Sequence, residues 1–124
     1  MAVTERKRFP RQCRELPDDV LEIVTTRLKV IAEPTRVRLM WLLDRDGGST
    51  VQELCDALPL TTPQNVSKHL GTLFQAGLVR RMREGGRVRY ELVDWTALWV
   101  VDQVVSSVSA QIEAQQERFA ATVE

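Results

Sequence analysis

The residues best suited to chemistry form a basic block in the second half of an otherwise neutral sequence. The chain of 124 residues carries 17 basic and 17 acidic side chains, yet residues 60–92 hold six basic residues against two acidic ones. The six are Lys68, Arg80, Arg81, Arg83, Arg87 and Arg89. Such a local excess is typical of a surface that binds a polyanion, because phosphate neutralisation supplies most non-specific affinity for nucleic acid. The alternative is a solvated hairpin that is enriched in arginine by chance.

Short polar side chains precede these arginines at helical spacing. Gln and Asn side chains can form paired hydrogen bonds with adenine in the major groove of DNA, and the N–H groups of a helix N-terminus favour phosphate. Gly71, on the same face, would allow the backbone to approach closely. The candidate DNA-contacting residues are Thr62, Gln64, Asn65, Ser67, Lys68, Thr72, Arg87 and Arg89. The alternative is that the helical ones among them are ordinary solvated residues on an exposed face.

Catalysis, disulfide bonding and membrane insertion find little support in the sequence. One histidine and two cysteines leave no evident nucleophile–base pair, and the common catalytic and phosphate-loop motifs are missing. Two cysteines are too few for a disulfide framework. No apolar run approaches the ~20 residues of a membrane helix, and no apolar stretch follows the charged N-terminus as it would in a signal peptide. We therefore expect a cytoplasmic protein that is not an enzyme.

Hydrophobic periodicity predicts the elements that must position the polar residues. Helices are expected at 17–32, from Pro34 to the Gly47-Gly48 pair, at 51–58, at 63–76 and at 94–119, with strands at 78–83 and 87–93 around Glu84-Gly85-Gly86. The order is thus α-α-α-α-β-β-α, a mainly helical fold with a β-hairpin. Residues 1–16 are basic and poor in apolar residues, so we expect a flexible arm followed by a single domain at 17–124.

Apolar residues indicate which face of each helix is buried. In the second helix, Val37, Met40, Trp41 and the pair 42–43 are expected to line the core. In the last helix, alternating three- and four-residue spacing creates a seam resembling that of a coiled coil. The seam consists of Leu98, Val101, Val105, Val108 and Ile112, with Trp95 and Trp99 beside it. A small core cannot obviously cover this surface, so we expect a dimer; the alternative is that the seam packs on its own domain.

Two short helices joined by a tight turn and followed by an arginine-rich hairpin describe a winged helix-turn-helix. The sequence LKVIAEPTRVRL at 28–39 resembles the opening signature of the ArsR/SmtB family of bacterial repressors. Further along the chain, the sequence resembles the family's recognition helix and the segment that leads from it into the hairpin. The residues are Val66-Ser67-Lys68-His69-Leu70, Leu73 and Ala76-Gly77-Leu78-Val79. The resemblance covers residues 20–93. It implies a homodimer, built on the first and last helices, that binds double-stranded operator DNA until an inducer releases it.

Metals are the best-known inducers of this family, but the family's ligand patterns are incomplete here. Many members carry Cys-Val-Cys before the turn, whereas this chain has Cys55 and then Ala57 in place of the second cysteine. Other members bind zinc through histidines of the last helix, which has none here. The resemblance leaves a site of Cys13 and Cys55 across the dimer for a thiophilic ion such as Hg(II), As(III) or Cd(II), because thiolates select soft ions. Two thiolates suit linear Hg(II), whereas As(III) ordinarily takes a third sulfur that one pair lacks.

Other interpretations of the cysteines and of the whole domain stay open. Cys55 falls on the apolar face of its helix, where a free cysteine commonly acts as a small hydrophobic residue. Arginines beside Cys13 favour its thiolate, which also allows a redox switch through an intersubunit disulfide. His69 follows the recognition-helix pattern of the family and is expected to be structural. The fold also occurs in modules that bind only protein, for which affinity would depend little on salt.

Overall fold

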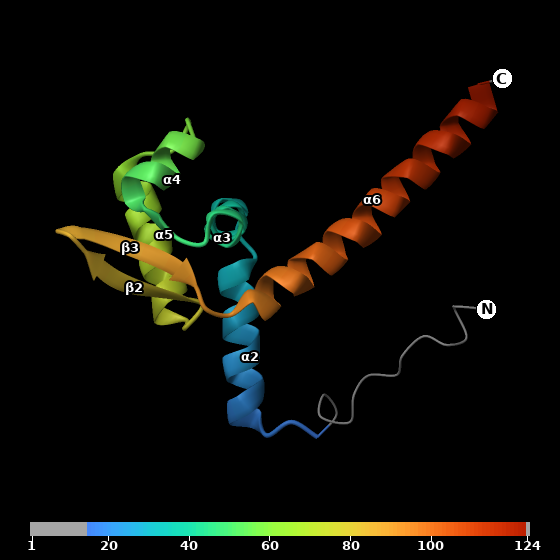
Figure 1. Cartoon of the computed structure of the whole chain (residues 1–124). Helices are drawn as coiled ribbons and strands as arrows, with labels where there is room; N and C mark the ends of the chain where they lie inside the picture. Colours follow the sequence, from blue (N-terminus) through green and yellow to red (C-terminus); the bar gives the residue numbers. More distant parts are fainter. Residues whose placement is uncertain (1–14, 124) are drawn as a thin grey trace.

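The computed structural model describes residues 15–123, which form five helices and a small antiparallel sheet whose hairpin projects from one side (Figure 1). In chain order the elements are α2 (Asp18–Ile31), α3 (Pro34–Asp46), β1 (Ser49–Thr50), α4 (Val51–Ala57), α5 (Pro63–Gln75), β2 (Val79–Glu84), β3 (Arg87–Leu92) and α6 (Trp95–Val123). The mainly helical fold with a hairpin is confirmed. The expected arm lies, except for its last two residues, outside the described residues.

Local sequence signals set most of the helix ends. Pro34 is the first residue of α3, and the Glu33 carboxylate accepts a hydrogen bond from the backbone N–H of Arg36 at 2.9 Å. Gly47 ends the same helix in the left-handed conformation, with φ of 70°, which glycine adopts without steric cost. Pro17 precedes α2 as its N-cap instead of lying within its first turn. At the other end of the chain, α6 extends to Val123, beyond the predicted end at 119.

The core gathers where α3, α4, α5 and the sheet meet. It consists of Ile31, Leu39, Met40, Leu42, Leu43, Leu54, Val66, Leu70, Leu73, Leu78, Val79, Tyr90 and Ala97. The prediction that Trp41 belongs to this core is wrong, because its side chain is 53% exposed. At 3.6 residues per turn, Trp41 projects about 200° around the helix axis from Leu39, on the far side of the core face.

The sheet contains a strand that periodicity did not predict. Ser49 and Thr50 pair with Tyr90 and Arg89, which makes a three-stranded sheet in the order β1-β3-β2. A two-residue strand is too short to show any alternation, so the predicted order lacked it. Glu84 also belongs to a strand instead of the turn, because it pairs with Arg87. The hairpin turn is therefore the two glycines at 85–86, both with positive φ.

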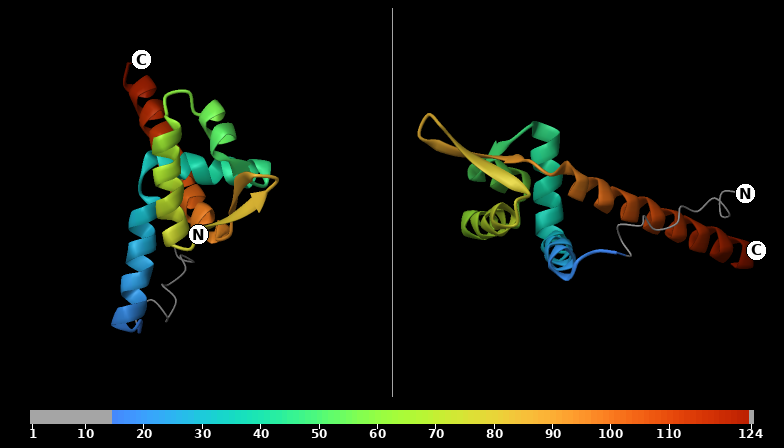
Figure 2. Two further views of the ribbon diagram at one scale, coloured as in Figure 1. Left: turned by 90° about the vertical axis from the view of Figure 1, so that its left-hand side faces the viewer. Right: turned by 90° about the horizontal axis from the view of Figure 1, so that it is seen from below.

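The hairpin and the second half of α6 project from opposite sides of the helical body (Figures 1 and 2). Every residue from 102 to 122 is exposed, so the apolar seam of α6 does not pack on its own domain over that length. On α2, only Ile31 is buried, and five large apolar residues of the helix are exposed. These are Val20, Leu21, Ile23, Val24 and Leu28. Two long helices thus each present an apolar face without a partner in the described chain.

Candidate nucleic-acid interface

Helix α5 is fixed through one face and presents the other to solvent. Val66, Leu70 and Leu73 are fully buried, and α5 contacts α3, α4 and β2. The helix begins at Pro63, where the Thr62 hydroxyl accepts a hydrogen bond from the N–H of Asn65 at 3.1 Å. The opposite face carries the predicted polar residues. Gln64, Asn65, Ser67 and Lys68 are all exposed.

Two threonines of the predicted interface have hydroxyl groups that form hydrogen bonds with the backbone of α5. Thr62 is the N-cap described above, and its oxygen is occupied by the amide of Asn65. Thr72 is half-buried, and its hydroxyl donates to the backbone oxygen of Lys68 at 3.2 Å. A hydroxyl that caps a helix orients its first turn, so Thr62 determines where Gln64 and Asn65 point.

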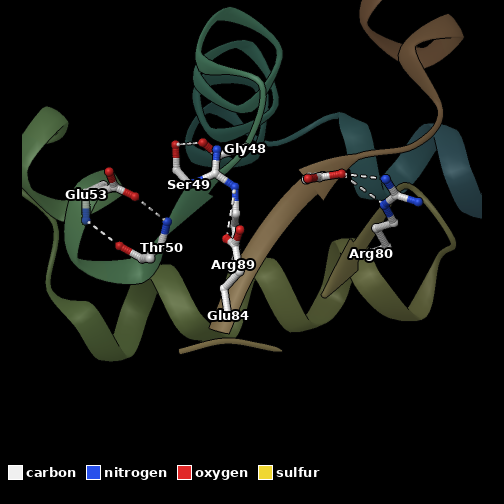
Figure 3. Close-up of polar contacts among 8 residues, drawn as sticks. Gly48, Ser49, Thr50, Glu53, Arg80, Glu84 and Arg89 are labelled. Atoms are coloured by element: carbon white, nitrogen blue, oxygen red, sulfur yellow. Dashed lines mark hydrogen bonds and ion pairs between the residues drawn. The ribbon is translucent and has the colours of Figure 1, made fainter. Parts of the chain in front are cut away.

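Helix α4 is positioned by a capping box at its N-terminus. The Thr50 hydroxyl accepts from the N–H of Glu53 at 3.2 Å, and the Glu53 carboxylate accepts from the N–H of Thr50 at 2.9 Å (Figure 3). The backbone hydrogen bond from Thr50 is the main reason that the pKa of Glu53 lies below its usual value. Because Thr50 also belongs to β1, the same residue joins the helix-turn-helix to the sheet.

His69 connects α5 to the junction between α2 and α3. Its Nδ1 lies 3.3 Å from Nη1 of Arg36 and 3.7 Å from the Glu33 carboxylate, and its side chain is 14% exposed. Arg36 also donates from Nε to the backbone oxygen of Val30 at 2.6 Å. Desolvation is the largest single influence on the pKa of Glu33 and raises it. Hydrogen bonds from the backbone of Arg36 and Thr35 lower the pKa, and the net result is a pKa below the usual value. These contacts agree with the expected structural role of His69.

One face of the hairpin has its arginines paired with acids. Arg80 donates from Nη2 and Nε to the same carboxylate oxygen of Glu91 at 2.6 and 3.0 Å. Nε of Arg89 lies 3.7 Å from the Glu84 carboxylate, and its half-buried side chain also lies against Gly48 (Figure 3). A Cβ at position 48 would come within 2.9 Å of Arg89, so the glycine makes room for this arginine. Arg89, a predicted DNA contact, is thus engaged within the protein.

The other face and the tip of the hairpin carry arginines that have no acidic partner in the described chain. Arg81 stacks over the ring of Phe74 on α5 at 4.0 Å, which ties this face of the hairpin to the polar helix. Arg83 follows on the same face and is exposed, and Arg87 is exposed beside the glycine turn. Within residues 15–123, neither Arg83 nor Arg87 forms an ion pair. Arg83 was not among the predicted contacts, although strand alternation from Arg81 to the turn could have indicated it.

The surroundings of Cys55 favour the protonated thiol over the thiolate. Cys55 is half-buried on α4 and packs against the core. Burial raises the pKa of its thiol, and the neighbouring carboxylate of Asp56 raises it further. Cys13, the other predicted ligand, lies outside the described residues. Over 15–123, no group of three or more His, Cys, Asp or Glu side chains is placed to hold a metal ion.

The fold and this surface together define a winged helix-turn-helix, and the comparisons with known proteins agree. A model of the helix-turn-helix domain matches residues 31–81. The chain is 37% identical over 98 residues to the arsenic resistance transcriptional regulator ArsR1 of Pseudomonas putida, covering 77% of this chain and 73% of that protein. It is 38% identical over 78 residues to the regulator KmtR of Mycobacterium tuberculosis, covering 62% and 58% respectively.

A solved structure extends this likeness over most of the fold. The antimony-specific transcriptional repressor AntR superposes with a TM-score of 0.64 at 28% identity, covering 89% of this chain and 98% of that one. The chain belongs to the ArsR/SmtB family of transcriptional regulators. It is therefore a DNA-binding regulator and not an enzyme, as the sequence predicted. No helix among residues 15–123 is long and apolar enough to cross a membrane.

Proposed function

We propose that the protein is a homodimeric repressor that inserts α5 into the major groove of its operator and places the hairpin on the flanking backbone. The observation that carries this proposal is the division of α5 into a buried apolar face and an exposed polar one. Gln64 and Asn65, in the first turn, would contact base edges, because recognition helices read DNA through their N-terminal residues. Ser67 and Lys68 would contact phosphate, together with Arg83 and Arg87 of the hairpin.

Specificity of the two amide side chains is tested by substitution. Gln64→Ala and Asn65→Ala should each make the protein less selective for base sequence when it selects its operators. A paired amide–adenine contact discriminates against the wrong base by ~1–3 kcal/mol. Gln75→Ala is the matched control, since Gln75 is an exposed glutamine at the opposite end of the same helix. An unaltered preference in both first-turn variants would contradict direct reading of bases by these residues.

The unpaired apolar faces of α2 and α6 are proposed to form the dimer interface. Leu28 and Ile31 of α2 line a shared groove with Val104 and Val108 of α6, so one partner could cover both helices at once. Burial of apolar surface stabilises by about 25 cal/mol per Å². A two-fold dimer would also place two α5 helices on half-sites about one DNA turn, or a multiple of it, apart.

Dimerisation is tested by placing a charge in this groove. Val108→Asp should shift the protein to a monomer in sedimentation equilibrium and weaken DNA binding, because an unpaired carboxylate resists burial. Gln103→Asp introduces the same charge on a different side of α6 and should leave the dimer intact. A Val108→Asp protein that sediments as a dimer would show that the interface lies elsewhere.

A thiophilic ion is proposed as the inducer that releases the DNA. The support comes from relatives named for arsenic and antimony, together with a free thiol at Cys55 on the helix that precedes α5. Cys13 of the partner subunit's arm would supply the second thiolate; two thiolates suit linear Hg(II) best, while As(III) ordinarily takes a third sulfur. The raised pKa of Cys55 means that the ion must displace a proton, so its affinity should fall as the pH is lowered.

This inducer is tested on the preformed complex with DNA. Hg(II), As(III) and Cd(II) are titrated into that complex while fluorescence anisotropy follows release, with Cys13→Ser and Cys55→Ser beside the unsubstituted protein. Release that is lost in both variants supports the intersubunit site. Tight binding at every ion concentration would leave Cys55 as a packing residue and assign the signal to another effector, such as an oxidant that joins the two cysteines.

A further inference from the structure

All three tryptophans of the chain line one groove between α3 and the beginning of α6. The groove has a volume of about 560 Å³, within the range of small-molecule sites. Trp41 comes from α3, and Trp95 and Trp99 come from successive turns of α6. Their side chains are 53%, 65% and 54% exposed. Large aromatic side chains bury well in cores, so three exposed ones that converge on one groove indicate a site for an occupant.

The charges on this groove indicate what the occupant carries. Asp44 and Asp102 line it from the two opposing helices, with Arg38 as its basic residue, so the lining has a net negative charge. Neither aspartate forms an ion pair with another residue of the described chain. The face of an indole ring attracts cations, and Trp41 already holds the Arg45 guanidinium 5.1 Å from its ring centre. Aromatic walls with excess carboxylate suit an amphipathic organic cation.

Helix α3 can transmit occupation of this groove to the DNA-binding surface. Besides α6, it contacts the polar helix α5 and the hairpin strand β3. A ligand bound between α3 and α6 would change the angle between α6, which is proposed to form the dimer interface, and α3, which contacts α5. In a two-fold dimer this angle sets the separation of the two α5 helices, and that separation must match the half-site spacing.

We propose that this groove binds an amphipathic organic cation, and that binding changes the affinity of the dimer for DNA. The inference rests on the proposed function for its consequence, since a change in DNA affinity requires a DNA-binding dimer. It does not involve Cys55, which is not among the groove residues. Binding and consequence can therefore be measured separately.

Binding is measured on the full chain without DNA, through the fluorescence of its three tryptophans. Tetraphenylphosphonium should quench this fluorescence saturably, whereas tetraphenylborate, which has the same shape and the opposite charge, should bind at least tenfold more weakly. The double variant Asp44→Asn, Asp102→Asn should lose at least tenfold in affinity for the cation. The control pair Asp56→Asn, Glu113→Gln removes the same charge from exposed positions outside the groove and should bind as the unsubstituted protein does.

Val37, Val101 and Val105 line both this groove and the neighbouring groove assigned to the dimer interface, so a second copy of the chain is the rival occupant. Quenching of the tryptophans by acrylamide distinguishes the two occupants. Tryptophans that acrylamide quenches readily in the dimer support an open groove, whereas tryptophans shielded from acrylamide would overturn the proposal. Equal affinity for the two tetraphenyl ions would overturn the assignment of a cation.

The consequence is measured by anisotropy with labelled DNA. Tetraphenylphosphonium should change the dissociation constant at least fivefold, as is typical of linked sites, while tetramethylammonium at the same concentration controls for ionic strength. An unchanged constant at saturating cation would overturn the regulatory part of the proposal. Failure to bind DNA in the absence of any cation would instead overturn the proposed function and leave the groove assignment standing.

Discussion

Arg80 and Arg83 lie three residues apart on the same strand but should behave differently on DNA. Arg80 donates two hydrogen bonds to Glu91, whereas Arg83 is exposed and has no ion-pair partner in the described chain. If the hairpin rests on the DNA backbone, Arg83 is free to neutralise a phosphate and Arg80 is already neutralised. Arg83→Ala should therefore lower the salt dependence of DNA binding, and Arg80→Ala should not.

The size of the effect follows from counterion release. Each phosphate contact contributes about 0.9 to the slope of log K against log salt, so in the proposed homodimer the loss of one contact per subunit should reduce the slope by about 1.8. Over a fourfold rise in salt, the Arg83→Ala dimer should then lose about twelvefold less affinity than the unsubstituted dimer. Both substitutions remove one positive charge per subunit, so the change in net charge is matched.

The assay needs no knowledge of the operator. Fluorescence anisotropy with a labelled duplex of random sequence, at four or five salt concentrations, gives the slope for each variant. Circular dichroism of each variant checks that the fold is retained. Equal slopes for Arg83→Ala and the unsubstituted protein would remove Arg83 from the interface. A reduced slope for Arg80→Ala would show that its pairing with Glu91 does not persist on DNA.

Three further predictions concern stability and reactivity. Leu70→Ala, at a position with no exposed surface, should lower the free energy of unfolding in urea by about 2–5 kcal/mol, whereas Leu60→Ala, at a fully exposed position, should change it by less than about 0.5 kcal/mol. The pKa of Glu53 is lowered in the folded state, so its carboxylate stabilises the protein at pH values above the ordinary glutamate pKa. This stabilisation is lost as the pH falls through the lowered pKa. The difference in melting temperature between Glu53→Gln and the unsubstituted protein should therefore vanish in acid. In a Cys13→Ser background, alkylation of Cys55 by iodoacetamide should show a midpoint pH above that of free cysteine, because burial raises the pKa of this thiol; a midpoint below it would contradict the environment described here.

Local signals determined the elements of this protein. The caps at Thr50 and Thr62 and the left-handed glycines at 47 and 77 each depend on residues within a few positions along the chain, so they can be predicted from the sequence alone. The polar face of α5 was predictable for the same reason, because helical periodicity separates it from Leu70 and its apolar neighbours. The exposed surface of α6 was likewise expected from its seam.

Only the tertiary structure decided which charged and aromatic side chains are available. Strand alternation separates Arg80 and Arg83 onto opposite faces of the hairpin, but only the antiparallel register places Glu91 opposite Arg80. The register also brings Arg89 against Gly48, some forty residues away along the chain. The tryptophans of α3 and α6 form one groove because two helices cross at that point. These contacts depend on packing between distant segments of the chain. They cannot be predicted from the periodicity of a single segment.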